Sequence, residues 1–411
     1  MSHVTDLVCT TCAKPVVAGA LTCQDDGGTL DVRYDYETVG RVMSPDTLSA
    51  DRNPTMWRYR ALLPIEDDAH LPPLTVGGTP LYAAPRLAID SGVGAMWIKD
   101  ETRQPTGSLK DRASALAVVK AREAGAKVVT TASTGNAAAA LAGISASVGQ
   151  ENVIFVPDAA PEAKIAQLLA YGSRLVLVRG NYAAAFDLCS AAVARYGWYD
   201  RNTGINPYMT EGKKTVALEI LEQLEWSAPD VILVSVGDGS IIGGVHKGVK
   251  DALALGWIER MPRLIGVQAE GSDYMAQAYE SGENVTSKPP IEASTIADSI
   301  SADLPRDRVK ALAAVTETGG AYLRVTDEEI LAAIPLLARG SGVFAEPAGA
   351  AAYAGLLAAK RLGHIGGDDE AVVIATGSGL KDVASARRAT AAETPIHVAP
   401  DIDELARALE P

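Results

Sequence analysis

The sequence has few of the features that mark membrane, nucleic-acid-binding and disulfide-stapled proteins. No stretch of about twenty consecutive apolar residues occurs in its 411 residues, so no membrane-spanning segment is expected. Its 37 basic and 51 acidic side chains give a formal net charge of −14, and the basic residues are not clustered. Phosphate backbones and anionic lipid surfaces both attract clustered Lys and Arg. We therefore expect neither a nucleic acid nor a membrane as a partner.

Cysteine is scarce as well. The chain has only four cysteines, and three of them fall within the first 23 residues. This number cannot form a disulfide framework for a chain of this length. The opening residues, MSHVTDLVCTTC, also lack the basic start and apolar core of a signal peptide. A reducing, cytoplasmic setting is what we expect.

What the sequence does contain is an alternation of two kinds of segment. Hydrophobic residues make up 47% and charged residues 21% of the chain, as in globular proteins of two or three domains. Ala- and Leu-rich stretches with helical spacing separate short runs rich in Val and Ile, which predicts an α/β fold with mostly parallel sheets. The runs predicted as buried strands are Met96–Lys99, Lys127–Thr131, Val153–Val156, Leu175–Val178, Val231–Val236, Leu264–Val267 and Ala371–Ala375.

The segment Trp97–Arg112 reads WIKDETRQPTGSLKDR, a strand followed by a turn and the start of a helix. Lys110 falls in the first turn of that helix, where the helix macrodipole favours anions over cations. This position lowers the pKa of a lysine and makes a neutral, nucleophilic amine easier to obtain. The alternative is an ordinary surface lysine paired with Asp111 or Glu101.

The segment Thr130–Ala137 reads TTASTGNA and also joins a strand to a helix. Ser133 and Thr134 bring hydroxyl groups, and Gly135 lets backbone amides approach a ligand. A helix N-terminus at this point suits an anion such as the carboxylate of an amino acid. The alternative is a simple N-cap formed by Ser or Thr.

The segment Val236–Gly244, VGDGSIIGG, has the same strand–loop–helix pattern. Its glycines suit a nest of backbone amides that holds a phosphate. A dinucleotide fingerprint would need G-x-G-x-x-G, and here the third glycine comes one residue late.

The segment Ala375–Asp382, ATGSGLKD, again follows a predicted strand. Thr376 and Ser378 place hydroxyl groups at the end of that strand. A hydroxyl, rather than a carboxylate, is what would meet an unprotonated pyridine nitrogen. The alternative is a turn whose glycines supply positive φ angles.

A reactive lysine, a carboxylate site, a phosphate loop and a strand-end hydroxyl are together the parts that hold pyridoxal phosphate with an amino acid. On these motifs the chain resembles the fold-type II pyridoxal-phosphate enzymes, the tryptophan synthase β family, and within them the threonine synthases. Pro105–Arg112, PTGSLKDR, is similar to the family's NPTGSFKDR. Gly204–Thr215, GINPYMTEGKKT, and Phe344–Ala352, FAEPAGAAA, are similar to further family segments. The resemblance runs from about Cys9 to Asp382.

The resemblance implies a role for each motif. Lys110 is the Schiff-base lysine and takes the α-proton of the substrate, and Thr376 meets the pyridine nitrogen of the cofactor. The substrate carboxylate binds to the loop made of Ser133, Thr134, Gly135, Asn136 and Ala137, with Asn136 also contacting the cofactor. The cofactor phosphate binds to Gly237, Asp238, Gly239, Ser240 and Ile241.

The resemblance also implies an architecture. It consists of two open, mostly parallel sheets flanked by helices, with a small cysteine-bearing ribbon at the N-terminus, and the enzymes are usually homodimers. We expect residues 1–40 to form the zinc-ribbon-like segment and 41–120 a lead-in and the first part of the large cofactor domain. Residues 121–204 are expected to form the small α/β domain, 205–395 the main part of the large domain, and 396–411 a C-terminal tail.

The implied activity is that of a threonine synthase-like carbon–oxygen lyase, which converts O-phosphohomoserine to threonine and phosphate. Threonine synthases often carry GNFDDALR, whose basic residue we associate with the phosphate of the substrate. Gly180–Asp187 reads GNYAAAFD and so places Asp187 at that position, where an acid would repel a phosphate. The alternative is a β-eliminating or β-replacing enzyme that acts on serine, threonine or an O-phosphorylated relative.

The N-terminal cysteines form a separate pattern. Cys9 and Cys12, followed by Cys23 and Asp26, have the spacing of a zinc ribbon with one ligand changed. Three thiolates and a carboxylate can hold Zn²⁺ tetrahedrally. The alternative is a knuckle that folds without metal. Cys189 lies on an apolar helical face and is expected in the core.

Overall fold

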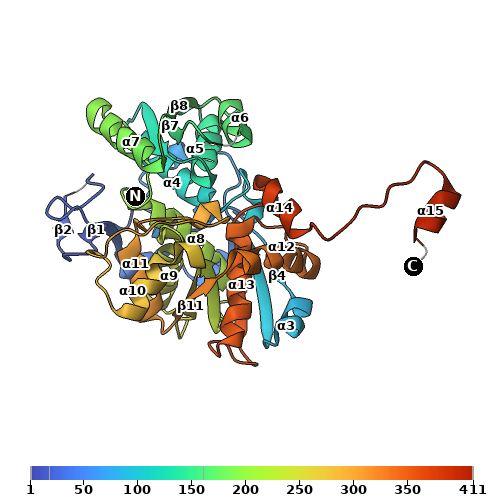
Figure 1. The fold of residues 1–411 in the computed structure, drawn as a ribbon. Helices are drawn as coiled ribbons and strands as arrows, with labels where there is room; N and C mark the ends of the chain where they lie inside the picture. The colour runs from blue at the N-terminus through green and yellow to red at the C-terminus, as the bar shows by residue number, and fades with distance from the viewer. Residues whose placement is uncertain (1, 18, 161, 410–411) are drawn as a thin grey trace.

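The computed structural model of the chain describes residues 2–17, 19–160 and 162–409. Two open sheets flanked by helices make up the body, and a third, small sheet packs at its side (Figure 1). This confirms the predicted α/β class with two mostly parallel sheets. Among the described residues, no helix is both long enough and apolar enough to cross a membrane.

The larger sheet has six strands in the order β12-β11-β10-β13-β5-β4. All neighbours are parallel except β4, which pairs antiparallel with β5. Strand β10 reads VILVS with every residue buried, as expected for a parallel strand that is covered on both faces. In sheet order the strands are β12 Ala321–Val325, β11 Arg263–Ala269, β10 Val231–Ser235, β13 Glu370–Ala375, β5 Ala95–Asp100 and β4 Leu81–Ala83.

The second sheet has four strands, all parallel, in the order β8-β7-β6-β9. They are β8 Arg174–Val178, β7 Glu151–Pro157, β6 Val128–Ala132 and β9 Tyr199–Asp200. Helices α5 Asn136–Ser147, α6 Glu162–Ala170 and α7 Tyr182–Tyr196 lie beside this sheet in the upper part of Figure 1. The strands and helices of this unit thus all come from one stretch of the chain.

The remaining helices belong to the larger unit, to the lead-in that precedes it and to the tail. The α-helices are α1 Tyr36–Val42, α2 Pro45–Ala50, α3 Pro85–Ser91, α4 Lys110–Glu123, α8 Tyr208–Gln223, α9 Ser240–Ala254, α10 Tyr274–Ser281, α11 Arg308–Glu317, α12 Asp327–Ser341, α13 Pro347–Arg361, α14 Val383–Ala389 and α15 Ile402–Leu409. Six short 3₁₀ helices are η1 Met56–Leu62, η2 Asp68–His70, η3 Glu101–Arg103, η4 Glu270–Ser272, η5 Asp298–Ile300 and η6 Gly379–Lys381. Helix α15 lies well away from the body, at the end of an extended segment (Figure 1).

Helix α8 is buried on all sides. Every residue from Met209 to Leu221 is buried, and the helix packs against both α4 and α9. Charged side chains on such a helix cannot reach bulk water, and they need partners inside the protein. For Glu211, Lys214 and Glu219, two groups of partners meet this need, one around α4 and one between the small sheet and α9.

The first group is an ion cluster around Arg112 of α4. The Arg112 guanidinium donates hydrogen bonds to both carboxylate oxygens of Glu101 at 2.8 and 2.7 Å, and to both of Glu219 on α8 at 2.7 Å. Lys99 of β5 donates to Glu219 at 2.8 Å. All four side chains are nearly inaccessible to water. The two cations and two carboxylates therefore neutralise each other and lock α4, α8 and β5 together.

The second group connects α8 to the small sheet, whose order is β2-β1-β3. Its antiparallel strands are β1 Val4–Cys9, β2 Pro15–Val16 and β3 Leu30–Tyr34. The Tyr34 hydroxyl at the end of β3 donates to Glu211 of α8 at 2.6 Å. The Tyr36 hydroxyl donates to Asp251 of α9 at 2.6 Å. Lys214 of α8 forms ion pairs with both carboxylates, at 2.6 and 2.7 Å.

The Arg112 cluster makes a prediction about stability. Replacing Arg112 with Met leaves two buried carboxylates facing one lysine, which is expected to cost about 3–5 kcal/mol of folding free energy. The matched control is Arg361→Met, because Arg361 pairs with Glu329 while its own side chain is 62% exposed, and its loss is expected to cost under about 1 kcal/mol. Urea unfolding followed by circular dichroism measures both; equal shifts in the two variants would contradict the prediction.

Candidate active site

The four predicted loops meet where parallel strands end. Strands β10, β13 and β5 are neighbours in the larger sheet, and each runs into a segment singled out by its sequence. Strand β6 of the second sheet runs into the Thr130–Ala137 segment and then into α5. Side chains beyond the carboxyl ends of parallel strands share one edge of the sheet. Residues from four distant parts of the chain are therefore brought to one site.

Backbone hydrogen bonds fix the loop that carries Lys110. The Leu109 N–H donates to the carbonyl of Thr376 at 2.9 Å, and the Ser378 N–H donates to the carbonyl of Gly107 at 2.9 Å. The turn before α4 is thus joined to the loop after β13. Lys110 begins α4 two residues before Arg112, and the ion cluster holds the same turn from below. The backbone position of Lys110 is therefore held by contacts on both sides of it in the sequence.

A small cavity of about 60 Å³ lies at the start of α9, with Lys110 and Lys213 on its wall. The loop here consists of Gly237, Asp238 and Gly239, and α9 begins without a side-chain cap. A Cβ on Gly237 would lie 2.7 Å from the backbone of Ile300, and Gly239 has a φ of 86°. Only glycine allows this path, which leaves the first N–H groups of α9 free to face an anion.

Three buried cations lie at or near this cavity: Lys110 and Lys213 line it, and Arg201 lies close enough to Lys110 to act on its pKa. Lys213 of α8 donates to Ser240 Oγ at 2.7 Å, and burial together with Lys110 and Arg201 lowers its pKa well below the ordinary value. Burial, and then Arg201, lowers the pKa of Lys110. Burial lowers the pKa of Arg201 to about 10. These shifts share one cause, which is positive charge held away from water without enough counter-charge.

The counter-charge is indeed small. Within the described part of the chain, none of the three cations has a carboxylate oxygen within ion-pair distance. Arg201 Nη2 and Ser235 Oγ are buried without a hydrogen-bond partner. Asp238 is the nearest acid on the loop, and burial raises its pKa. Buried charges are normally paired, so the site is electrostatically complete only with an anion in it.

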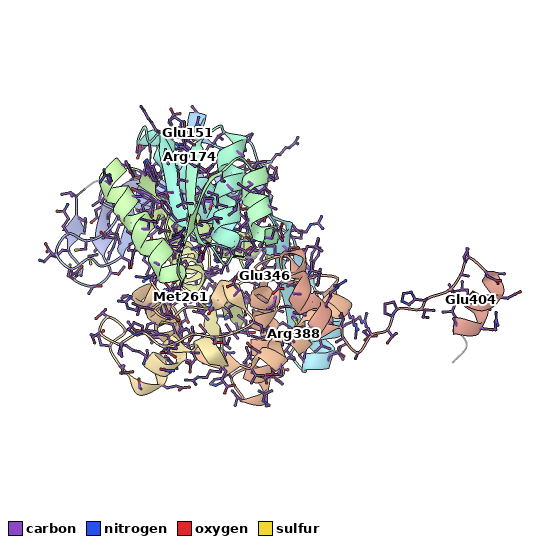
Figure 2. The ribbon with its side chains drawn as sticks, turned by 45° about the horizontal axis from the view of Figure 1, so that its top comes forward. Glu151, Arg174, Met261, Glu346, Arg388 and Glu404 are labelled. Atoms are coloured by element: carbon purple, nitrogen blue, oxygen red, sulfur yellow. The ribbon has the colours of Figure 1, made fainter. Side chains whose placement is uncertain are left out.

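A larger cavity of about 400 Å³ lies between the two sheets. Thr134, Gly135 and Asn136 line it from the second sheet, and Ser299 and Glu346 line it from the larger unit. Figure 2 shows Glu346 in the middle of the body, below the strands of the second sheet. Helix α5 has no side-chain cap, so its first N–H groups are available to a carboxylate.

Asn136 joins the two walls of this cavity. Its side-chain amide donates to Glu346 Oε1 at 2.6 Å and to Ser299 Oγ at 3.2 Å. Burial raises the pKa of Glu346. An ion pair at 2.6 Å between Lys164 of α6 and Asp298 of η5 spans the same two units. The small unit therefore rests against the large one through polar contacts around the cavity.

Most of the predicted site residues lie on these two cavities. Lys110, Gly237, Asp238, Gly239, Ser240 and Ile241 line the small one, and Thr134, Gly135 and Asn136 line the large one. In the part of the chain that the structure describes, Ser133, Ala137 and Thr376 line neither. Thr376 is buried at the end of β13, and its carbonyl accepts the Leu109 bond. The chemical roles assigned to all these residues stay predictions.

Three further residues were not found by sequence reasoning: Arg201, Lys213 and Glu346. Lys213 lies in the segment Gly204–Thr215 and Glu346 in Phe344–Ala352, and both segments had been noted for their family likeness. No local pattern marks either residue as chemical, because each meets its partners only across the fold. Arg201 stands in no motif, and no signal in the sequence points to it.

Comparison with known proteins gives a consistent result. Residues 73–377 match the family described as pyridoxal-phosphate dependent enzymes. The threonine synthase of Methanocaldococcus jannaschii is 38% identical over 392 residues, which cover 95% of this chain and 95% of that protein. The threonine synthase of Methanosarcina acetivorans is 40% identical over 364 residues, or 88% of each chain.

Solved structures share the fold. The processed form of threonine deaminase isoform 2 from Solanum lycopersicum superposes with a TM-score of 0.65 at 25% identity, covering 76% of this chain and 87% of that chain. A fungal L-serine ammonia-lyase from Rhizomucor miehei has a TM-score of 0.64 at 23% identity, covering 76% and 97%. The latter likeness bears on the fold alone.

The geometry predicts that Lys213 binds a phosphate group. Lys213→Met is expected to weaken the binding of pyridoxal phosphate about 10- to 100-fold, since a hydrogen bond from a charged donor contributes about 1.5–3 kcal/mol. Binding of pyridoxal, which has no phosphate, should not change. Fluorescence titration of the apoprotein measures both affinities.

Lys250→Met is the matched control, because Lys250 lies on the exposed face of α9 and pairs with Glu317. It should bind both compounds as the unchanged protein does. Equal losses for pyridoxal phosphate and pyridoxal in Lys213→Met would contradict a phosphate contact.

Proposed function

The chain belongs to the pyridoxal-phosphate dependent enzymes and is a threonine synthase-like lyase, and from this premise we propose that it removes phosphate from Cγ of O-phosphohomoserine and adds water at Cβ, giving threonine. The substrate is a small amino acid. What supports the finer assignment is the charge of the site, taken with the names of the relatives.

The residues present fit the cofactor. The small cavity has the free N–H groups of α9, Ser240 and Lys213 for its phosphate, and Lys110 beside them for its aldehyde carbon. Two further features fit a bound phosphate. Ser235 Oγ is buried without a hydrogen-bond partner, and the glycines of the loop before α9 leave space for an anion. When bound, pyridoxal phosphate supplies an electron-withdrawing ring that stabilises negative charge on the substrate's α-carbon.

Lys110 moves the protons of the reaction. A general base must be neutral when it accepts a proton, and a lowered pKa makes the neutral amine available nearer to neutral pH. Burial and the charge of Arg201 provide that shift for Lys110 Nζ. Because the hydrogen bonds of Leu109 and the Arg112 cluster hold the helix start, the backbone of Lys110 stays in place while its amine takes and returns protons.

The loop at the start of α5 orients the substrate. Its N–H groups bind the carboxylate, and Asn136, held by Glu346 and Ser299, fixes the loop against the larger unit. Orientation of this kind sets which bond at the α-carbon is aligned with the ring.

The observation that carries the proposal is a surplus of cations beyond those one phosphate requires. Lys213 and the N–H groups of α9 suffice for the cofactor. Among the described residues, Arg201 and Arg306 line neither cavity, but both lie close enough to Tyr182 of α7, as does Asp238 of the loop, to act on its pKa. The backbone N–H of Arg306 donates to Asp238 Oδ1 at 3.4 Å, and the side-chain guanidinium of Arg306 lies 4.6 Å from the ring of Phe186 on α7. A second phosphate, the leaving group, accounts for these two charges.

The position of Arg306 also bears on the role of Asp187. Asp187 is exposed on α7, whereas its neighbour Phe186 is buried. The guanidinium of Arg306 rests on Phe186, so a cation comes to this face of α7 from another part of the chain. We propose that Arg306 takes the place of the base that the helix lacks at position 187.

Turnover tests the proposed reaction. The purified holoenzyme is mixed with O-phosphohomoserine, O-phosphoserine, O-phosphothreonine, serine and threonine, and phosphate, keto acid and threonine are measured. We expect phosphate and threonine in equal amounts from O-phosphohomoserine, and neither product with Lys110→Ala. Borohydride should attach the cofactor covalently to Lys110. If O-phosphohomoserine gave no phosphate or threonine while another substrate gave keto acid, the β-eliminating alternative would be established instead.

Arg306 makes a sharper prediction. Arg306→Gln is expected to raise KM for O-phosphohomoserine about 10- to 100-fold, because a charge-assisted contact contributes about 1.5–3 kcal/mol, while the affinity for pyridoxal phosphate stays the same. Asp187→Asn is the matched control and should change KM by less than about threefold, as exposed charges interact weakly. If Asp187→Asn or Asp187→Arg improved turnover and Arg306→Gln had no effect, Asp187 would face the substrate phosphate.

We also propose that the protein is a homodimer, as the family resemblance implies, and that it is located in the cytoplasm. None of the four cysteines forms a disulfide in the described chain, which fits a reducing compartment. Light scattering at micromolar concentration measures the oligomeric state.

A further inference from the structure

The N-terminal ribbon gathers four side chains at one end. Cys9 ends β1, Cys12 lies in the turn after it, and Cys23 and Asp26 lie in the loop before β3. Their ligand atoms all lie within 4.8 Å of one another. In the part of the chain that the structure describes, no other group of three or more His, Cys, Asp or Glu residues comes together in this way.

The distances are those of a tetrahedral ion site. Cys12 Sγ and Cys23 Sγ are 3.8 Å apart, and Cys9 Sγ lies 3.4 and 3.6 Å from the two oxygens of Asp26. With metal–sulfur bonds of about 2.3 Å and a metal–oxygen bond of about 2.0 Å, tetrahedral angles place two sulfurs about 3.8 Å apart and a sulfur and an oxygen about 3.5 Å apart. Both kinds of separation match.

Backbone N–H groups point at these ligand atoms. The N–H groups of Thr11 and Cys12 donate to Cys9 Sγ at 3.3 and 3.5 Å. The Gly28 N–H donates to Asp26 Oδ1 at 2.8 Å and so orients that carboxylate. A Cβ on Gly28 would lie 2.8 Å from both Cys9 Sγ and Asp26 Oδ1. The loop is therefore shaped closely around the ligand atoms, with glycine where they need the space.

We propose that Cys9, Cys12, Cys23 and Asp26 form a structural Zn²⁺ site. A disulfide between Cys12 and Cys23 would need sulfurs about 2.0 Å apart, and it would leave Cys9 and Asp26 as two unpaired acids in contact. Three thiolates and one carboxylate match a borderline ion that prefers tetrahedral coordination. Four protein ligands close the coordination shell, so the ion takes no part in the chemistry of the active site.

The ion would hold the strand that braces α8. Strand β3 starts two residues after Gly28, and its Leu30 and Val32 are fully buried. Its last residue, Tyr34, reaches Glu211 on the helix that also carries Lys213. A ribbon this short has too little core to fold by itself, and metal binding contributes folding free energy in such units.

Metal content of the intact holoenzyme is the first test. Mass spectrometry of metals in protein purified without added zinc is expected to give about one Zn per chain and no stoichiometric iron. Cys12→Ser should lose the zinc, and Cys189→Ala, which removes a thiol from α7 far from the ribbon, should retain it. Absence of zinc even after incubation with a small excess, or its equal loss in both variants, would overturn the proposal.

Asp26→Cys tests the carboxylate and does not depend on a destabilised variant. Cobalt exchanged into the unchanged protein should show thiolate-to-metal absorption from three sulfurs, and Asp26→Cys should raise that absorption by about one third as a fourth sulfur is added. The affinity for pyridoxal phosphate should stay the same in both. An identical cobalt spectrum in the two proteins would remove Asp26 from the ligand set, and the proposal in this form would fail.

Discussion

The guanidinium of Arg112 is the interaction on which the rest of the structure depends. It joins the carboxylates of Glu101, after β5, and Glu219, on α8, and it stands two residues after Lys110, the lysine that we propose carries the chemistry. Removing charges from water is costly unless they are paired with good geometry. The cluster meets that condition with two cations and two carboxylates. The elements that converge on the active site are thereby fixed to one another before any ligand binds.

A few residues away the opposite arrangement holds. Lys110, Arg201 and Lys213 are buried without carboxylate partners, and the pKa of each is lowered as a result. The protein as a whole carries a net charge of −14, so attraction of anions is local and owes nothing to the surface. Helix N-termini and a few isolated cations concentrate positive potential at the two cavities where we propose that a phosphate and a carboxylate bind.

Features encoded by residues close together in the sequence could be predicted, whereas features that depend on distant residues could not. Strand, glycine loop and helix start are encoded within about ten residues, so β5, β6, β10 and β13 and the loops after them were predicted close to their observed places. Strand β12, AYLRV, is absent from the predicted strands because Arg324 interrupts its apolar run. Helix α8 begins at Tyr208 inside the Gly204–Thr215 segment, where buried charged side chains conceal the apolar pattern of a helix.

The site was predictable to the same extent. Lys110 and the phosphate loop follow from local patterns, and so did the likeness to a family. Lys213 and Glu346 could not be predicted from local patterns, because their partners are distant in the sequence. The contact that marks Lys213 is its hydrogen bond of 2.7 Å to Ser240, which only the fold brings about. The role of position 187 stays a prediction. The structure shows Asp187 exposed and the neighbouring Phe186 buried against the guanidinium of Arg306, which comes from a loop more than a hundred residues later in the chain, so no local pattern predicts that contact.

The burial of α8 has a consequence for how the chain is made. The hydrogen bond between Tyr34 and Glu211 joins residues 177 positions apart, so the ribbon leaves the ribosome long before the helix it packs on has been synthesised. Its buried tyrosines, and the charged groups of α8 and α9 that face them, gain their partners only when more than half of the chain is present. Folding of such a protein is dominated by contacts distant in sequence, which form late and slowly. The N-terminus is therefore first to be synthesised and among the last parts to complete its packing.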